Sequence, residues 1–330
     1  MKKILLLLVL ITACVPQNKI IDESDNGVEW IQGNFERNDY YLLHFFNSQC
    51  SICIEQANDL KEIQEKTPEV KIIGVHLPEF LFQKKKEIIL PEIEKAGITY
   101  SVVSDRNHTI RMNHSIMRVP SFVLLDSKAN VIEKTVELKK IKARLASIYP
   151  ERGISLKAPV RIISEKTTPK LYGGYAYARK GEFGNINETH FEVYTNYNLP
   201  KIILENKIYV EGEWFANQDR LNFISRSPGK MIVRFYGNKV SMLARSRARE
   251  FETIEKTLEE RVAFVLVDGK PIPKENAGKD ILYEKDGTSY LMIEPYAKVY
   301  DIAKFENEER RTLEFYPPKG RFNLFWIEFS

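Results

Sequence analysis

Short apolar runs and amphipathic stretches alternate along the first 150 residues. Tyr40–Phe46 (YYLLHFF) is an apolar and aromatic run with the length of a buried strand, and Val70–Leu77 is a second one. Between them, residues 54–66 have helical periodicity, with one apolar face formed by Ile54, Ala57, Leu60 and Ile63. The order strand, helix, strand predicts a βαβ unit. A basic amphipathic helix over Val136–Tyr149 is expected to close this region.

The pattern changes in the second half, where strand-like runs follow one another without helices. Turn residues separate these runs, for example at Gly237-Asn238 and Asp268-Gly269. So many short strands predict an all-β sandwich, of jelly-roll type. The expected strands are Phe191–Tyr197, Lys207–Trp214, Leu221–Ile224, Lys230–Tyr236, Lys239–Ala244, Arg261–Val267, Ser289–Pro295, Arg311–Tyr316 and Asn323–Phe329.

Length and composition fit two globular domains. The chain has 330 residues, of which 43% are hydrophobic and 28% charged. The net charge of +4 is small and evenly spread, which argues against a nucleic-acid partner. Three cysteines are too few for a disulfide-stapled scaffold. We expect a first domain over residues 27–150, a linker over 151–168 and the β-sandwich over 169–330.

The N-terminus has the pattern of an export signal. Lys2 and Lys3 precede an apolar run that ends at Cys14, and this run is too short to span a membrane. A plain secretory signal would leave Cys14 incidental. However, Ile11-Thr12-Ala13-Cys14 resembles a bacterial lipobox, which implies that residues 1–13 are removed and that Cys14 is lipidated. Residues 14–26 would then form a polar tether. The expected location is extracytoplasmic, on a bacterial membrane, in the periplasm or at the cell surface.

Cys50 and Cys53 form a CxxC pair in the turn between the first strand and the helix. A helix N-terminus favours a thiolate and lowers a cysteine pKa, so this setting indicates a redox motif. A second signal follows about 67 residues later, where Val119-Pro120 precedes the strand-like run Ser121–Asp126. A proline in this place can also simply open an edge strand.

The two motifs together resemble the thioredoxin fold. The stretch at residues 72–82 is similar to the thioredoxin-like module of DipZ-type proteins, relatives of the TlpA group. Residues 126–131 match the turn and return strand that follow the run Ser121–Asp126 in that family. The second half also resembles the C-terminal module of DipZ-type proteins, which looks like a carbohydrate-binding sandwich. The matching stretches are 168–175, 229–235 and 321–329.

The resemblance implies a mechanism without a bound cofactor or metal. Cys50 would attack a client disulfide, and Cys53 would resolve the mixed disulfide, so that the pair cycles through a Cys50–Cys53 disulfide. Pro120 would be cis and face the pair, and the backbone of Val119 would bind the client strand. His44 stands where thioredoxins have a buried acid, and would act as a base or as a cation beside the thiolate.

The resemblance also implies partners. Because the chain has no electron-relaying membrane domain of its own, a membrane protein of the DsbD/CcdA type would reduce it, and client proteins with disulfides would be reduced in turn. Two alternatives stay open: a glycan- or protein-binding lipoprotein with a structural dithiol, and a copper metallochaperone using His108 or His114. Aromatic residues that could stack on a sugar are Tyr172, Tyr175, Tyr177, Trp214 and Tyr236.

Overall fold

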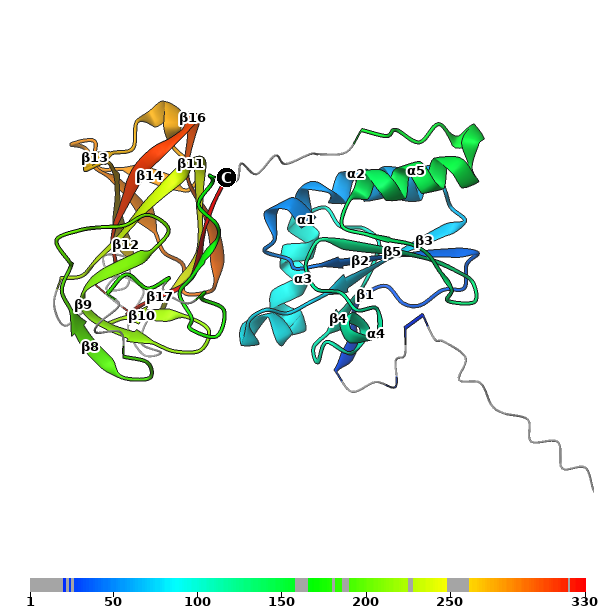
Figure 1. Cartoon of the computed structure of the whole chain (residues 1–330), viewed down its shortest axis with the longest axis horizontal. Coiled ribbons are helices and arrows are strands. Elements are labelled where there is room, and N and C mark those ends of the chain that lie inside the picture. The colour runs from blue at the N-terminus through cyan, green and yellow to red at the C-terminus, as the bar shows by residue number, and fades with distance from the viewer. Residues whose placement is uncertain are drawn as a thin grey trace, which may run out of the picture. The chain divides into compact units, whose positions relative to one another are not determined.

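The computed structural model describes residues 20, 21, 24, 27–157, 166–179, 182–185, 190–224, 228–247, 261–319 and 321–330. The chain divides into two units, Met1–Arg161 and Ile162–Ser330 (Figure 1). The predicted signal, Cys14 and nearly all of the predicted tether lie outside the described residues. Within those residues, no helix has both the length and the apolar character needed to cross a membrane.

The first unit is built on a six-stranded mixed sheet in the order β1-β4-β3-β2-β5-β6. The pairs β2–β3 and β3–β4 are parallel, and β1–β4, β2–β5 and β5–β6 are antiparallel. The predicted βαβ unit is confirmed, because β2 and β3 are joined through two short helices. The strands are β1 Val28–Gln32, β2 Tyr40–Phe46, β3 Val70–His76, β4 Ser101–Asp105, β5 Ser121–Asp126 and β6 Val131–Thr135.

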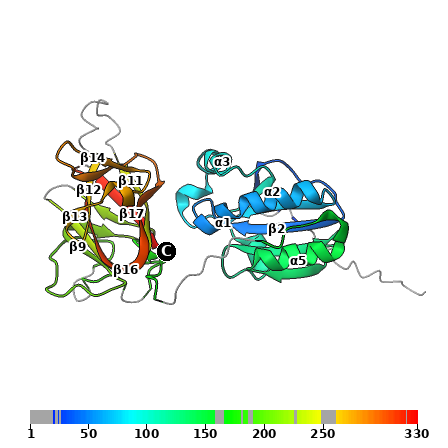
Figure 2. The same ribbon diagram turned by 90° about the horizontal axis from the view of Figure 1, so that it is seen from above.

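Both faces of this sheet are covered, because its central strands are apolar on both sides. Leu42 and Phe46 of β2 pack with α2, α3 and α5, whereas Leu43 and Phe45 pack on the other face with Ile110 of α4. Figures 1 and 2 show α2 and α5 side by side over one face. The helices are α1 Ser51–Glu55, α2 Ala57–Lys66, α3 Lys86–Lys95, α4 Thr109–Asn113 and α5 Leu138–Ile148, and short 3₁₀ turns cover η1 Leu81–Lys84 and η2 Pro150–Arg152.

The helix expected after the cysteine pair is present, but it is divided in two. Gln56 ends α1 and also precedes α2, and its backbone N–H bonds the carbonyls of Ile52 and Ile54. The apolar face predicted for this segment is buried at Ala57, Leu60 and Ile63. Thus the first helical turn, which carries Cys53, is a separate element placed against the core.

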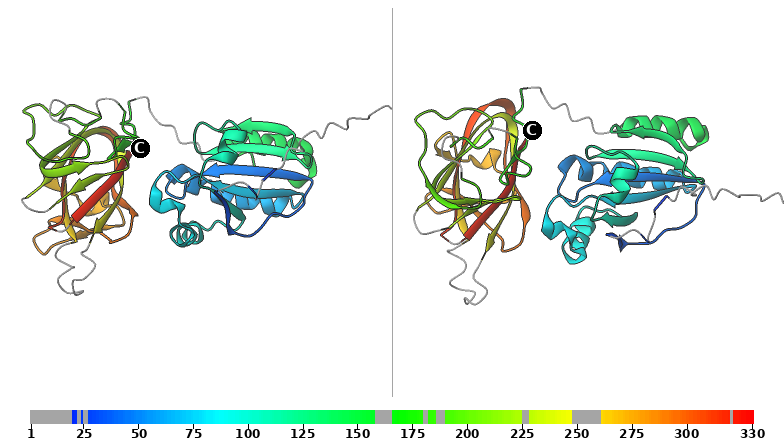
Figure 3. Two further views of the ribbon diagram at one scale, coloured as in Figure 1. Left: turned by 90° about the horizontal axis from the view of Figure 1, so that it is seen from below. Right: turned by 60° about the horizontal axis from the view of Figure 1, so that its bottom comes forward.

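The described part of the second unit is all β apart from one 3₁₀ turn, and its eleven strands form one sheet. The long strand β11 pairs along one edge with β16, and along the other edge first with β9 and then with β17. Because β10 joins β9 to β17, this part of the sheet closes on itself, and Figure 3 shows the strands wrapping around the interior of the unit. The bounds are β7 Leu171–Tyr172, β8 Tyr194–Tyr197, β9 Ile208–Ala216, β10 Leu221–Phe223, β11 Lys230–Arg247, β12 Val262–Val267, β13 Lys270–Pro271, β14 Ile281–Tyr283, β15 Ser289–Met292, β16 Lys298–Tyr316 and β17 Arg321–Phe329, with a 3₁₀ turn, η4, at Lys274–Asn276.

The turn predicted at Gly237-Asn238 is wrong. The two expected strands on either side of it are one strand, β11, which continues through this point with a bulge opposite β16. The backbone N–H groups of Asn238 and Lys239 both donate to the carbonyl of Ser330, at 2.8 Å. Since β16 spans both halves of β11, the backbone bonds that a hairpin would use are already made, and the glycine marks a bulge instead.

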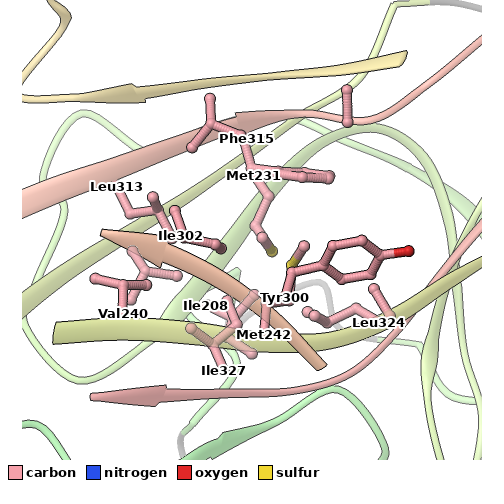
Figure 4. Packing of buried hydrophobic residues seen from close by; sticks show 14 of the residues in the cluster. Ile208, Met231, Val240, Met242, Tyr300, Ile302, Leu313, Phe315, Leu324 and Ile327 are labelled. Atoms are coloured by element: carbon pink, nitrogen blue, oxygen red, sulfur yellow. The ribbon is translucent and has the colours of Figure 1, made fainter. Parts of the chain in front are cut away.

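The core of the second unit comes from its own strands. Figure 4 shows part of it, with Met231 and Met242 of β11 facing Tyr300 of β16 and Leu324 of β17. The expected all-β second half is therefore confirmed at the level of a large β-sheet unit. The jelly-roll order of strands stays a prediction.

Candidate functional site

Cys50 and Cys53 form a disulfide bond at the beginning of α1, with their Cα atoms 5.2 Å apart. Cys50 is the N-cap residue of the helix, and its Sγ accepts a hydrogen bond of 3.3 Å from the backbone N–H of Cys53. This donor and the positive end of the helix would both stabilise a thiolate on Cys50.

The two sulfurs differ in their access to solvent. Cys53 is 0% exposed and belongs to the core of α2, α3 and α5, whereas Cys50 is only partly buried and packs at the margin of that core. A thiol that meets a client disulfide must be reachable, and a resolving thiol must be held close to it. The geometry therefore fits attack by Cys50 and resolution by Cys53.

The peptide bond between Val119 and Pro120 is cis, as the resemblance implies, and Pro120 is buried directly before β5. Val119 is only partly buried, and its side chain packs against the core that contains Cys53. A hydrogen bond across the proline also holds the loop: the Ser121 hydroxyl donates to the Arg118 carbonyl at 2.6 Å. The proline loop and the cysteine pair thus contact the same core.

His44 lies on β2, on the face of the sheet where Cys53 is buried. Its ring is stacked between Phe46 and Phe122, each with its centroid 5.1 Å away, and its Nδ1 lies 3.0 Å from the Tyr100 hydroxyl. Its Nε2 is buried and has no hydrogen-bond partner among the described residues. Burial lowers the pKa of His44 to about 3. The ring is neutral at physiological pH, which disfavours a cation beside the thiolate, and the same low pKa makes the ring a weak base, so the proton-handling role of His44 stays a prediction.

The loop before Cys50 carries three buried polar side chains that pattern analysis did not connect to a partner. Asn47, Ser48 and Gln49 are 5%, 8% and 6% exposed. Asn47 bonds Gln83 of η1 through both amide groups, at 2.9 and 3.2 Å. The Asn47 side-chain Oδ1 also accepts from the Gln49 N–H at 2.9 Å, and the backbone carbonyl of Asn47 accepts from the Cys50 N–H at 3.0 Å. These bonds fix the loop that presents Cys50.

Glu92 of α3 bonds the same loop with both of its carboxyl oxygens. The Ser48 hydroxyl donates to Oε2, and the Gln49 side-chain amide donates to Oε1 at 3.1 Å. His76, at the end of β3, reaches the other side of the Ser48 hydroxyl through Nε2 at 3.3 Å. Burial raises the pKa of Glu92 despite these donors, and burial lowers the pKa of His76 to about 3. The sequence signal for this cluster was a run of three polar residues between an apolar strand and a cysteine.

The residues of the two alternative functions are placed less favourably. Within the described part of the chain, no three or more His, Cys, Asp or Glu side chains form a group that could hold a metal ion. His114 packs on Phe45, on the face of the sheet opposite Cys53. Trp214 is fully buried in the core of the second unit, so it cannot stack on a sugar, whereas Tyr177 is 39% exposed.

Comparisons with known proteins agree with this site. Residues 38–131 match the family model described as thioredoxin-like. The chain is 34% identical over 103 residues to the thioredoxin-like protein SkfH of Bacillus subtilis, which covers 31% of this chain and 72% of SkfH.

Solved structures are similar at lower identity. StoA from Bacillus subtilis is 19% identical, with 31% of this chain and 75% of StoA covered and a TM-score of 0.28. A thiol-disulfide oxidoreductase from Bacteroides fragilis is also 19% identical, with 34% and 82% covered and a TM-score of 0.30. The assignment depends instead on SkfH, since the shared segment spans most of that protein. The residues matched by the family model include both the dithiol and the cis-proline loop. By this relationship the chain belongs to the thioredoxin-like family, with a thioredoxin-like domain that carries the Cys50–Cys53 pair in its first unit.

Proposed function

We propose that this protein reduces disulfide bonds of client proteins outside the cytoplasm, while it is anchored to a membrane by lipid on Cys14. The observation that carries the reaction is the Cys50–Cys53 pair, with a partly exposed sulfur at the N-cap of α1 and a fully buried one a turn later. The Val119–Pro120 loop would bind the client, and lipid on Cys14 would hold the protein at the membrane.

The reaction consists of two thiol–disulfide exchanges. The Cys50 thiolate attacks one sulfur of the client disulfide, so that a Cys50–client bond forms, the client S–S bond breaks and one client thiolate leaves. The Cys53 thiolate then attacks Cys50 Sγ and releases the second client thiolate. The client gains two electrons and two protons, and the pair is left as the Cys50–Cys53 disulfide. A membrane electron donor of the DsbD/CcdA type would return two electrons.

Three further residues act around this exchange. Pro120 removes a backbone donor and shapes the loop, so that the backbone of Val119 can pair with an extended client segment. His44, whose ring lies on the Cys53 side of the sheet and whose Nε2 has no partner among the described residues, would take up the Cys53 proton only transiently in the second step, because its low pKa makes it a weak base.

The anchor and the second unit complete the proposal. The lipobox-like run that ends at Cys14 and the export signal before it support an extracytoplasmic lipoprotein of DipZ/TlpA type. Replacement of Cys14 by Ala is expected to move the protein from the membrane fraction to the soluble fraction, and unchanged fractionation would remove the anchor from the proposal. The second unit would hold a glycan or another surface partner near the client.

The central test is to trap a client. A Cys53→Ala variant cannot resolve the mixed disulfide, so covalent complexes with client proteins should accumulate on Cys50, and they should disappear on addition of a reductant. The Cys50→Ala, Cys53→Ala double variant is the control, because it keeps the fold but has no attacking sulfur. If the single variant traps no more protein than the double variant, the dithiol is structural, and the alternative of a binding protein holds.

A further inference from the structure

The Glu92 carboxyl group is hydrogen-bonded to the two residues that directly precede the attacking cysteine in the chain. One oxygen accepts from Gln49, the residue next to Cys50, and the other accepts from Ser48. The loop itself is rigid, because backbone bonds and the Asn47–Gln83 pair hold it on both sides. The mechanism of exchange makes no use of this carboxyl group.

A partly buried carboxylate at this point carries a desolvation cost that its neighbours do not remove, since burial raises its pKa despite the two donors. Buried polar groups are normally satisfied by hydrogen bonds, and neutral side chains could have satisfied Ser48 and Gln49 equally well. A glutamate adds a negative charge to the loop that carries the sulfur that must become a thiolate. Like charges in a poorly solvated site disfavour each other, so each raises the pKa of the other.

We propose that Glu92 is a positioning residue of the disulfide-exchange centre, which holds the Cys50 loop through Ser48 and Gln49 and makes the dithiol more reducing by its negative charge. This inference deepens the proposed function, because it concerns the same dithiol. A stabilised thiolate favours the reduced form of such a pair and gives a more oxidising couple. A carboxylate that destabilises the thiolate has the opposite effect.

The charged and titratable groups around Glu92 influence its pKa, and therefore the pH range in which its negative charge acts on Cys50. Lys95 on its own helix lowers the Glu92 pKa, but less than burial raises it. His76 of β3 faces it through Ser48, and is neutral. Cys50 follows Gln49, whose side-chain amide donates to the Glu92 carboxylate. The charge on Glu92 is present above its pKa and is lost as the pH falls through that pKa, so the effect on Cys50 must fade in acid.

The variant Glu92→Gln separates charge from position. Its amide oxygen can still accept from Ser48, and its amide nitrogen can donate to the Gln49 Oε1 atom, which has no partner among the described residues, once that side chain turns over. The loop should therefore stay in place without the charge. Glu94→Gln is the matched control, because Glu94 is on the same helix and is exposed.

Two quantities are measured on the purified protein between pH 4.5 and 8.5: the equilibrium constant of Cys50–Cys53 against glutathione, and the pH profile of Cys50 alkylation in the reduced protein. At high pH we expect Glu92→Gln to be more oxidising than the wild type by up to tenfold, which is about 30 mV for a two-electron couple. The Cys50 pKa should be lower. Both differences should vanish at low pH, and Glu94→Gln should match the wild type throughout.

A purely structural role predicts another result. If Glu92→Gln differs from the wild type by a constant factor at every pH, or does not differ, the electrostatic part of the inference is wrong. If the couple shifts as expected but no client is trapped by the Cys53→Ala variant, the proposed function fails while the inference stands. A couple that shifts the other way overturns the inference and leaves the function untouched.

Reciprocity gives a test that needs no variant. If the Glu92 charge raises the Cys50 pKa, a Cys50 thiolate must raise the Glu92 pKa by the same factor. The Glu92 carboxyl carbon can be titrated by NMR in the oxidised and in the reduced wild-type protein. Equal Glu92 titrations in the two states, when alkylation shows that the Cys50 thiolate forms in the same pH range, would contradict the inference even if Glu92→Gln does not fold. A Glu92→Asp variant, which keeps the charge, should retain the more reducing couple.

Discussion

Two buried histidines, both in the neutral form, lie on the neighbouring strands β2 and β3. His44 on β2 and His76 on β3 are both 0% exposed, and burial lowers the pKa of each to about 3. In the unfolded chain both would titrate near their ordinary value of about 6.5. Between these two values the unfolded chain binds more protons than the folded one, so the free energy of unfolding must rise with pH in this window.

We therefore predict that the first unit loses stability as the pH falls from 7 to 5, by about 2 kcal/mol for each of the two histidines. The stability is fully present above about pH 6.5 and is lost progressively toward pH 3. Hydrogen exchange of β2 and β3 amides at the two pH values measures it. His44→Phe, whose ring can occupy the stack between Phe46 and Phe122, should remove about half of the loss.

The control for this prediction is His190, which is exposed in the second unit. His190→Phe should leave the pH dependence of the first unit unchanged. If His44→Phe loses as much stability as the wild type over this range, the pKa of His44 does not differ between the folded and the unfolded chain. The buried His44 would then not be a source of the pH effect.

At the scale of single residues, the sequence revealed the groups whose chemistry is local. Cys50 and Cys53 are recognised by their spacing and by the strand and helix around them, and Pro120 by the strand that follows. Glu92 could not be found in this way, because it is 42 residues from Cys50 along the chain and reaches it only after α3 packs beside the sheet. Its helix predicts a polar residue at the margin of an apolar face, without indicating what that residue contacts.

Among the helices, α5 is joined to α2 by an ion pair between the buried Lys142 of α5 and Asp59 of α2. Lys142 is 1% exposed, and its ammonium group donates to the Asp59 carboxylate and to the Lys157 carbonyl. The predicted amphipathic helix should carry its basic residues on its polar face, and Lys142 departs from that pattern. Position 142 lies next to the buried Ile141, on the side of α5 that packs against α2. The carboxylates of Asp59 and Glu62 lie there, so a cation is stabilised at this buried position.

We predict that Lys142→Met destabilises the first unit by about 2 kcal/mol. Methionine fills the volume of the lysine stem, but Asp59 loses its ion pair and the Lys157 carbonyl loses its donor. Urea unfolding followed by hydrogen exchange in α2 and α5 measures the loss. The matched control is Lys140→Met on the same helix, because the Lys140–Glu137 pair is exposed and should contribute at most about 0.5 kcal/mol. Equal effects of the two substitutions would contradict the interpretation.

Element boundaries were predictable where side-chain periodicity decides them, and less so where strand pairing does. Strands β2, β3 and β5 coincide closely with apolar runs, since both of their faces are buried. β11 was expected as two strands, because Gly237-Asn238 is equally compatible with a turn and with a bulge. The pairing partner β16 decides between them, and its own sequence around residues 304–311 is polar and gives no strand signal.

For the whole molecule, the two units draw their cores from separate parts of the chain. The two core clusters of the first unit contain buried residues from 20 to 154, and the core cluster of the second unit contains residues from 171 to 329. No buried residue in these clusters, as far as the chain is described, comes from the other unit. A domain with its own core can fold alone. The dithiol chemistry and the β-sheet unit should therefore be separable.

This separation leads to a prediction about two fragments, residues 20–161 and 162–330, the first of which keeps the buried Ile20 and Ile21. We expect each to fold, with the first fragment retaining the reduction potential of the full chain because Cys50, Glu92, His44 and the Val119–Pro120 loop all belong to it. Thermal unfolding of the full chain should show the same two transitions as the fragments. A first fragment with a shifted potential would mean that the second unit acts on the dithiol. A second fragment that fails to fold would mean that its closed β-sheet needs the first unit.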